Sequence, residues 1–199
     1  MAQKYMSMRN LRFLLHDVLN VEQLTAYERY QDHNKEGFDM MLDSAKQIAD
    51  NLLFPIYEEM DKQPPKMGDG VVHVHPGMKA IMKETGESGW IVAQEDYEIG
   101  GQQMPHTVYN AANFIFHAAN TSAASYFGLT MGSAELISSF GSQELKDTYM
   151  SKMFEGKWQG TMALTEPHAG SSLGDIRTTA SPNEDGSYSI KGQKIFISA

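Results

Sequence analysis

The spacing of apolar residues changes near Gly156, and this change limits the folds open to the chain. Before Gly156 apolar side chains recur at helical spacing, whereas along Trp158–Leu164 they alternate with polar ones. Helical spacing indicates amphipathic helices, and alternation indicates strands. Helices followed by strands, without βαβ alternation, favour the α+β class. We expect a leader helix at 1–33, a helical domain at 34–156, and the first strands of a β domain at 157–199.

Apolar periodicity and helix-terminating residues predict the individual helices. In the leader, Leu11, Leu14, Leu15, Val18 and Leu19 lie at helical spacing, so the segment either docks on the body or serves as an interaction segment. Further helices are predicted from Phe38 to Leu53 or Phe54, where Pro55 ends or kinks the helix; at Gly77–Thr85; from Pro105 through Phe116; at Ala123–Phe140; and from the N-cap Ser142 to Gly156. Glycine and proline predict loops at Asp61–His75 and Glu87–Met104.

Composition excludes several classes of function. The chain has 16 Lys and Arg against 25 Asp and Glu, a formal net charge of −9, which is unfavourable for binding a nucleic-acid backbone. It has no apolar run long enough to span a bilayer, and Arg12, His16 and Asp17 interrupt the one apolar stretch near the N-terminus. Without cysteine it has neither a disulfide framework nor a thiolate zinc site. We expect a cytoplasmic protein.

A loop with the sequence Thr165-Glu166-Pro167-His168-Ala169-Gly170-Ser171 separates the first alternating run from the next one, Ile176–Ser181. A turn at Asn183–Gly186 and a third run from Tyr188 follow. A loop set by glycine and proline between strands can bring backbone N–H groups close to an anion. Its serine hydroxyl can also reach a phosphate.

A hydrolase motif lies within the same region. Gly170-Ser171-Ser172-Leu173-Gly174 satisfies the G-x-S-x-G pattern of a nucleophile elbow, which requires a strand before it and a helix after it. Here the residues after Gly174 are β-branched and strand-like, and no histidine follows His168. The sequence therefore argues against a hydrolase.

Other polar residues are assigned no chemistry. His73 and His75 have the spacing of two ligands on one side of a strand, but no carboxylate lies near them in the sequence, so we predict no metal site. His168 receives no role. Glu166 is expected to be structural and not an acid or base.

The loop, together with Lys194-Ile195-Phe196-Ile197-Ser198, resembles the flavin-binding signature of the acyl-CoA dehydrogenase family. Glu95–Gly101 resembles the acidic–Tyr–Gly–Gly loop of that family, with two residues between Tyr97 and the glycine pair where the family pattern is tighter. Phe140–Lys146 resembles the start of the helix that leads into the middle domain. Asn10–Leu19 is similar to the leader of a subgroup that includes enzymes acting on 3-methylthiopropanoyl-CoA.

The resemblance implies an FAD site and names its residues. The first set is Met162, Ala163, Leu164, Thr165, Gly170 and Ser171, of which Thr165 and its neighbours would hydrogen-bond the edge of the flavin ring and Ser171 would also touch the acyl-CoA. The second set, Phe196, Ile197 and Ser198, would pack on the other face of the ring. The family usually has tryptophan where this chain has Phe196, threonine at Ser198, and often aspartate at Ser172. An aromatic ring and a hydroxyl are kept at the first two positions.

The resemblance further implies a fold and a reaction. A helical N-terminal domain is followed by the start of a β-barrel-like middle domain, and the chain ends within that domain. The family oxidises an acyl-CoA to the trans-2-enoyl-CoA in fatty acid metabolism, usually passes its electrons to an electron-transfer flavoprotein, and forms homo-oligomers. Its glutamate base belongs to a C-terminal region without a counterpart in these 199 residues, so no catalytic residue is assigned and the chain alone is expected to be inactive.

A second interpretation belongs to a different class of function. The chain would be a non-catalytic helical interaction module that binds no cofactor. The two interpretations differ in whether further strands and a four-helix region follow Ala199 in the parent reading frame.

Overall fold

The computed structural model describes residues 5–198 and divides the chain into two compact units, Met1–Gly160 and Thr161–Ala199. The α-helices are α1 (Met8–Phe13), α2 (Lys35–Ile48), α3 (Tyr57–Lys62), α4 (Gly77–Glu87), α5 (His106–Phe140) and α6 (Gln143–Phe154). The strands are β1 (Lys66–Gly68), β2 (Val71–His73), β3 (Thr179–Pro182) and β4 (Tyr188–Lys191). The expected α+β class is confirmed.

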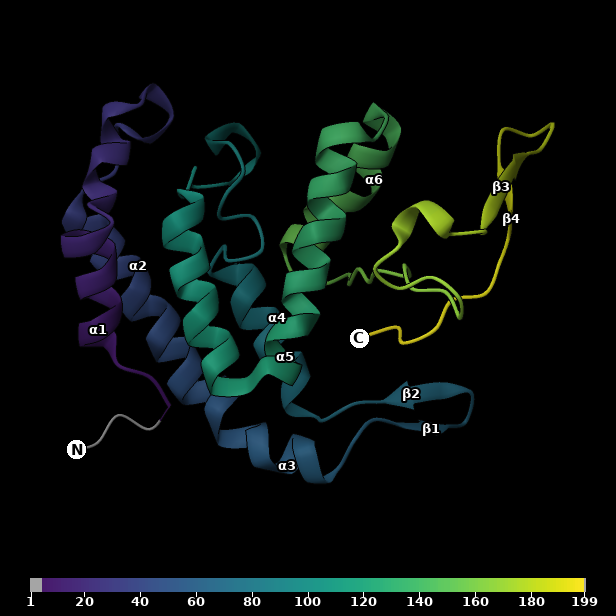
Figure 1. Cartoon of the computed structure of the whole chain (residues 1–199), viewed down its shortest axis with the longest axis horizontal. Helices are drawn as coiled ribbons and strands as arrows, with labels where there is room; N and C mark the ends of the chain where they lie inside the picture. The colour runs from purple at the N-terminus through teal and green to yellow at the C-terminus, as the bar shows by residue number, and fades with distance from the viewer. Residues whose placement is uncertain (1–4, 199) are drawn as a thin grey trace. The chain divides into compact units, whose positions relative to one another are not determined.

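The core of the first unit lies between its helices. α2 runs beside the first half of α5 (Figure 1), and its face with Phe38, Leu42 and Ala45 is completely buried. These residues recur at helical spacing, so one apolar stripe faces the core. Phe116 of α5 makes edge-to-face contacts with Trp90 and with Phe127, at 5.2 Å between ring centroids in both cases. Such aromatic pairs add to the stabilisation that burial of their area provides.

Pro55 disrupts the helix after α2, as predicted, but does not stop the chain from coiling. α2 passes into a π turn at Ala49–Leu53, then a 3₁₀ turn at Phe54–Ile56, and then α3. Proline has no N–H and its ring clashes with the preceding turn, so α-helical hydrogen bonding cannot continue unchanged through it. Tyr57 donates its N–H to the Phe54 carbonyl, and the Leu53 carbonyl is left for another donor.

Asn120 supplies that donor and divides α5 into two halves. Its backbone is non-helical (φ −165°, ψ 93°). Its side chain is buried, donates to the Leu53 carbonyl at 3.2 Å, and accepts from the N–H of Ala123 at 3.0 Å. Asn120 therefore acts as the N-cap of the second half of α5. The two separate helices predicted here thus meet at a single non-helical residue.

The leader differs from its predicted helical face. α1 is followed by a π turn at Leu14–Val18 and then by 3₁₀ turns. The wider π turn changes the angular spacing of side chains. Leu15 is buried, whereas Leu14, Val18 and Leu19 are each at least half exposed. The predicted apolar face therefore does not dock as one stripe.

The predicted loop at Asp61–His75 contains a hairpin. β1 and β2 pair antiparallel, with Gly68 opposite Val71. Asp69 and Gly70 both have positive φ, 50° and 78°, as a two-residue type I′ turn requires. The hairpin was not predicted within this loop, because its short, exposed strands give no alternating pattern.

The predicted strand at Trp158–Leu164 does not form. Trp158 instead packs against α6, where its ring lies 5.7 Å from that of Tyr149 and 4.0 Å from the Lys152 ammonium nitrogen. Gly160 donates its N–H to the Thr130 hydroxyl at 3.2 Å. Alternation indicates which faces a segment presents, but a strand also requires a partner for its backbone groups.

The second unit contains the predicted turn between two strands. β3 and β4 pair antiparallel, with Thr179 opposite Lys191, around the turn at 183–186. In the first unit, the Ser142 hydroxyl caps α6 by accepting from the Leu145 N–H at 3.3 Å, as predicted. Among residues 5–198, no helix combines the length and apolarity needed to cross a membrane.

Candidate functional site

The loop that follows Thr165 is held in a tight turn. Glu166 and Ala169 exchange two backbone hydrogen bonds, of 3.0 and 3.1 Å, around Pro167 and His168. Proline fixes φ at the first corner of such a turn. The His168 ring nitrogen Nε2 lies 3.1 Å from the Asp175 carbonyl oxygen, which ties the turn to the next segment.

Glu166 organises this part of the molecule from a buried position. Its side chain is 2% exposed. One carboxylate oxygen accepts from the Arg177 N–H at 2.8 Å; the other accepts from the Thr178 N–H at 3.0 Å, the Thr178 hydroxyl at 2.6 Å, and the Lys194 ammonium at 2.8 Å. A buried carboxylate needs such partners to compensate for lost hydration. The prediction that Glu166 is structural agrees with this geometry, because its acceptor sites are occupied.

The same contacts set the charge of Glu166. Hydrogen bonds from Lys194, Thr178 and the Arg177 backbone hold the pKa of the Glu166 carboxyl far below its ordinary value. Hydrogen bonds to the ionised form of a carboxyl favour that form. Glu166 is therefore an anion at neutral pH and cannot serve there as a general acid.

We expect the order of this loop to depend on pH in one direction. Because the folded-state pKa of Glu166 is lowered, its stabilising contribution is fully present above the unfolded pKa of about 4.3 and is lost as pH falls through the folded value. Carboxyl-carbon NMR should therefore give Glu166 a titration midpoint clearly below about 4. A midpoint at or above the ordinary glutamate value would contradict the network.

Lys194 joins the loop to the C-terminal segment. Its ammonium donates to the Leu164 carbonyl at 2.9 Å as well as to Glu166. The N–H of Ile195 donates to the Thr165 carbonyl at 2.9 Å. The Thr161 hydroxyl donates to the Ser198 carbonyl at 2.5 Å. The two segments that carry the predicted flavin residues therefore lie side by side.

The predicted site residues are mostly at the surface of the second unit. Phe196 is 87% exposed, and Met162 is 58% exposed. Phe196 also has a positive φ of 56°, an uncommon backbone conformation for an aromatic residue. The other exposed members are Ala163, Leu164, Gly170, Ser171, Ile197 and Ser198, and Thr165 is half-buried. The structure thus brings the segment Thr161–Thr165 beside Lys194–Ser198, with Gly170 and Ser171 beyond the turn.

Sequence reasoning missed the residues that hold this arrangement. Lys194 and Thr178 were not assigned roles, although Lys194 directly precedes an apolar triplet in the signature. One signal was available. Glu166 lies two residues after the apolar Leu164 and directly before Pro167, and a glutamate that is buried beside such a run needs a partner.

The two histidines of the hairpin region are engaged separately. The His75 Nδ1 atom accepts from the Gly77 N–H at 3.0 Å, and its Nε2 atom lies 3.3 Å from a Glu59 carboxylate oxygen. His73 is on β2, opposite Lys66. Among residues 5–198, no group of three or more histidines and carboxylates has the arrangement of a metal site.

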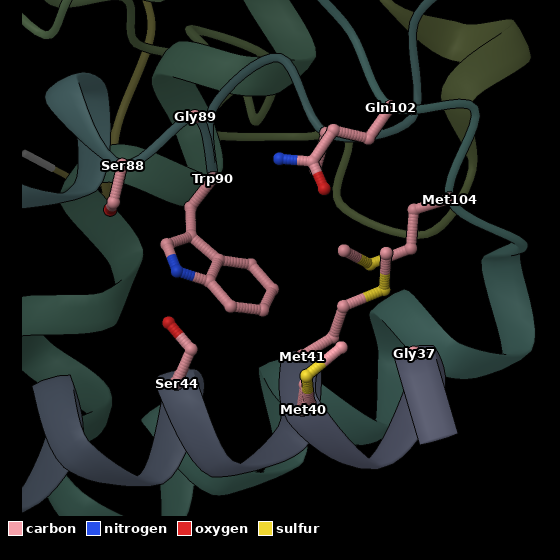
Figure 2. A pocket seen from close by; sticks show the side chains of 10 residues that line it. Gly37, Met40, Met41, Ser44, Ser88, Gly89, Trp90, Gln102 and Met104 are labelled. Carbon is pink, nitrogen blue, oxygen red and sulfur yellow. The ribbon is translucent and has the colours of Figure 1, made fainter. Parts of the chain in front are cut away.

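The first unit has a cavity of about 300 Å³ between α2 and the segment 88–104. Figure 2 shows the indole of Trp90 on one side and the thioethers of Met41 and Met104 on the other. Its lining is Gly37, Met40, Met41, Ser44, Ser88, Gly89, Trp90, Ala93, Gln102 and Met104. None of these side chains is ionisable near neutral pH, so the cavity can hold an apolar group but has no acid or base of its own.

Comparison with known proteins places this geometry in a family. The model of the acyl-CoA dehydrogenase N-terminal domain matches residues 35–157, more than half of the chain. This chain belongs to the acyl-CoA dehydrogenase family. The family resemblance stated from the sequence is thereby confirmed, although the matched residues 35–157 include neither the loop after Thr165 nor the leader.

Individual acyl-CoA dehydrogenases match nearly all of the chain. The 3-methylmercaptopropionyl-CoA dehydrogenase of Ruegeria pomeroyi is 31% identical over 95% of this chain and 32% of its own length. A butyryl-CoA dehydrogenase of Syntrophomonas wolfei is 32% identical over 96% of this chain and 32% of its own length. The first match confirms the similarity to the leader-bearing subgroup. The chain spans about a third of the length of these curated relatives.

A solved structure gives the same fold. The acyl-CoA dehydrogenase of Bacillus anthracis, in complex with FAD, superposes with a TM-score of 0.67 at 25% identity. The match covers 84% of this chain and 27% of that one.

Proposed function

We propose that the protein is a flavin-dependent acyl-CoA dehydrogenase that oxidises an acyl-CoA thioester to the trans-2-enoyl-CoA with FAD as cofactor. The observation that carries the proposal is that Thr161–Thr165 is hydrogen-bonded to Lys194–Ser198, because these segments contain the two parts of the family's flavin signature. Membership of the family and similarity to a protein solved with FAD support it.

The residues of the second unit fit a flat, polar-edged cofactor. Met162, Leu164, Phe196 and Ile197 expose apolar surface that an aromatic ring system would cover. No described residue accepts a hydrogen bond from the Thr165 N–H, which leaves a backbone donor for the ring edge. The exposed hydroxyl of Ser171 would face the pyrophosphate of FAD and the acyl-CoA.

FAD, when bound, supplies an acceptor for the hydride that leaves the β-carbon of the substrate. The residues of this chain would orient and hold the cofactor: the Thr165 N–H would donate at the ring edge, and Phe196 would cover a ring face. The base that removes the α-proton is assigned to a part of the family fold without a counterpart in these 199 residues. We therefore expect the 199-residue chain alone to give no turnover in dye-reduction assays with a panel of acyl-CoAs.

Other parts of the proposal follow from the family resemblance. The electrons would leave through an electron-transfer flavoprotein, and the protein would be a cytoplasmic homo-oligomer in fatty acid metabolism. These assignments add no residues to the site.

Flavin retention tests the site directly. In the full-length protein, Ser171→Ala and Phe196→Ala are expected to weaken FAD binding by about 2- to 10-fold each, since one hydrogen bond or one covered ring face is lost. The matched control is the pair His73→Ala and His75→Ala, which touches no predicted flavin residue. The ratio of flavin to protein absorbance after gel filtration measures the effect. Equal retention in all variants would count against the site.

A second candidate function has one observation in its favour. Phe13, Leu14, Val18 and Leu19 of the leader are each at least half exposed, as a segment that binds another protein could be. A non-catalytic helical interaction module would bind no FAD. Failure of the full-length protein to bind FAD, with retention of a partner that requires the leader, would favour this candidate.

A further inference from the structure

We propose that Lys194 is a positioning residue whose ammonium fixes the Leu164–Thr165 peptide, so that the Thr165 N–H faces the bound flavin. The inference rests on the proposed function, because it assigns a task within the proposed flavin site. It concerns a side chain that need not touch the cofactor.

The geometry begins with two hydrogen bonds from one ammonium group. Lys194 donates to the Leu164 carbonyl at 2.9 Å and to the Glu166 carboxylate at 2.8 Å. Its side chain is 20% exposed; the bond to Glu166 is partly buried, whereas the bond to the Leu164 carbonyl lies at the surface. A charge-assisted hydrogen bond of this kind is stronger than one between neutral groups.

Peptide planarity carries this restraint to Thr165. The described chain has no cis peptide bond, so the Leu164 carbonyl and the Thr165 N–H of their shared peptide point in opposite directions. When Lys194 holds the carbonyl, the N–H must face away from Lys194. The Thr165 carbonyl is held in turn by the Ile195 N–H at 2.9 Å, so the peptides on both sides of the Thr165 α-carbon are fixed.

The Thr165 N–H is therefore an oriented donor without a protein acceptor. No described residue accepts from it, while Thr165 itself is half-buried. A donor fixed before the ligand arrives loses no orientational freedom when it binds. Glu166 makes the anchor rigid, because it is bonded to Arg177 N–H and to Thr178 independently of Lys194.

Removal of the ammonium and weakening of its anchor can be separated. Lys194→Met removes both hydrogen bonds and releases the Leu164 carbonyl. Thr178→Val removes the hydroxyl bond to Glu166 and leaves the bond between Lys194 and Leu164 in place. It therefore reports only the effect of a less firmly held Glu166 carboxylate. Lys191→Met removes an exposed lysine of β4 and controls for lost surface charge.

The experiment measures three quantities on the full-length protein. FAD is titrated into the apoprotein of each variant, the carbonyl stretches of bound flavin are followed by vibrational spectroscopy, and the stability of the apoprotein is measured by urea unfolding. For Lys194→Met we expect about tenfold weaker FAD binding and a shifted flavin carbonyl band. Lys191→Met should match the wild type, Thr178→Val should lose stability without the band shift, and Lys194→Arg should recover part of the affinity.

Two outcomes would overturn the inference. One is Lys194→Met with wild-type affinity and spectrum. The other is Lys194→Met and Thr178→Val with affinity losses that follow their losses of stability, without a band shift in either.

A wild-type protein that binds no FAD would refute the proposed function and is recognised separately. The carbonyl ¹³C shift of Leu164 in the apoprotein then tests the contact between the Lys194 ammonium and the Leu164 carbonyl. A shift unchanged by Lys194→Met would overturn the contact on which the inference depends.

Discussion

Replacing Gly86 with alanine is expected to destabilise the helical unit by about 3 kcal/mol or more. Gly86 lies near the end of α4, where a Cβ atom would stand 2.3 Å from the carbonyl carbon and oxygen of Glu155 and 2.6 Å from the nitrogen of Gly156. These are backbone atoms, so no side chain can rotate away. The end of α6 would have to separate from α4, and the core contacts around both would loosen.

Gly128→Ala is the matched control for this substitution. Gly128 lies in α5, and a Cβ atom there would meet no atom within 4 Å. Alanine should stabilise the helix by about 0.5–1 kcal/mol, because glycine loses more backbone freedom on folding. Urea unfolding of both variants decides the matter. Equal midpoints for the two would mean that α4 and α6 are not in the contact described.

Glu166→Ala is expected to disorder the signature loop while the helical unit stays folded. The change leaves Lys194 and the N–H groups of Arg177 and Thr178 without their buried acceptor, which costs more than the bonds themselves contribute. Amide hydrogen exchange at Arg177 and Thr178 should accelerate by about 10- to 100-fold.

Two further variants make this test specific. Glu166→Gln keeps one acceptor oxygen. That oxygen should stay with Thr178 and Lys194, so that only the Arg177 amide exchanges faster. Glu184→Ala, in the exposed turn between β3 and β4, should leave exchange at both amides unchanged. Slow amide exchange at Arg177 and Thr178 in Glu166→Ala would contradict the conclusion that Glu166 holds the loop in place.

Local signals in the sequence located helix boundaries but did not predict the π and 3₁₀ turns of the leader. Ser142 was predicted as an N-cap and Pro55 as a disruption because each acts on its own turn, through one hydroxyl or one missing N–H. The strand predicted at Trp158–Leu164 was wrong because strand formation depends on a distant partner. Nothing in the alternation shows that Trp158 instead packs against Tyr149 and Lys152.

The candidate site was predictable only where a local sequence motif identifies its residues. The motif indicated the two flavin segments, and their resemblance to a family gave them roles that remain predictions. The contact between Lys194 and Glu166 joins residues 28 positions apart, and spacing alone does not bring them together. The sequence likewise gives no recognisable sign of the exposure of Phe196 or of its positive φ.

The interruption of α5 at Asn120 separates the two halves of that helix mechanically. In a continuous helix, inserting one residue rotates every following side chain by about 100° about the axis. At Asn120 the chain leaves helical geometry, and its side chain begins the next half by capping Ala123. The orientation of Phe127 toward the core is therefore set after the break and not inherited from Phe116. A change in the length of one half would therefore not rotate the other about the helix axis, and the two halves are joined instead through the edge-to-face contact of Phe116 with Phe127.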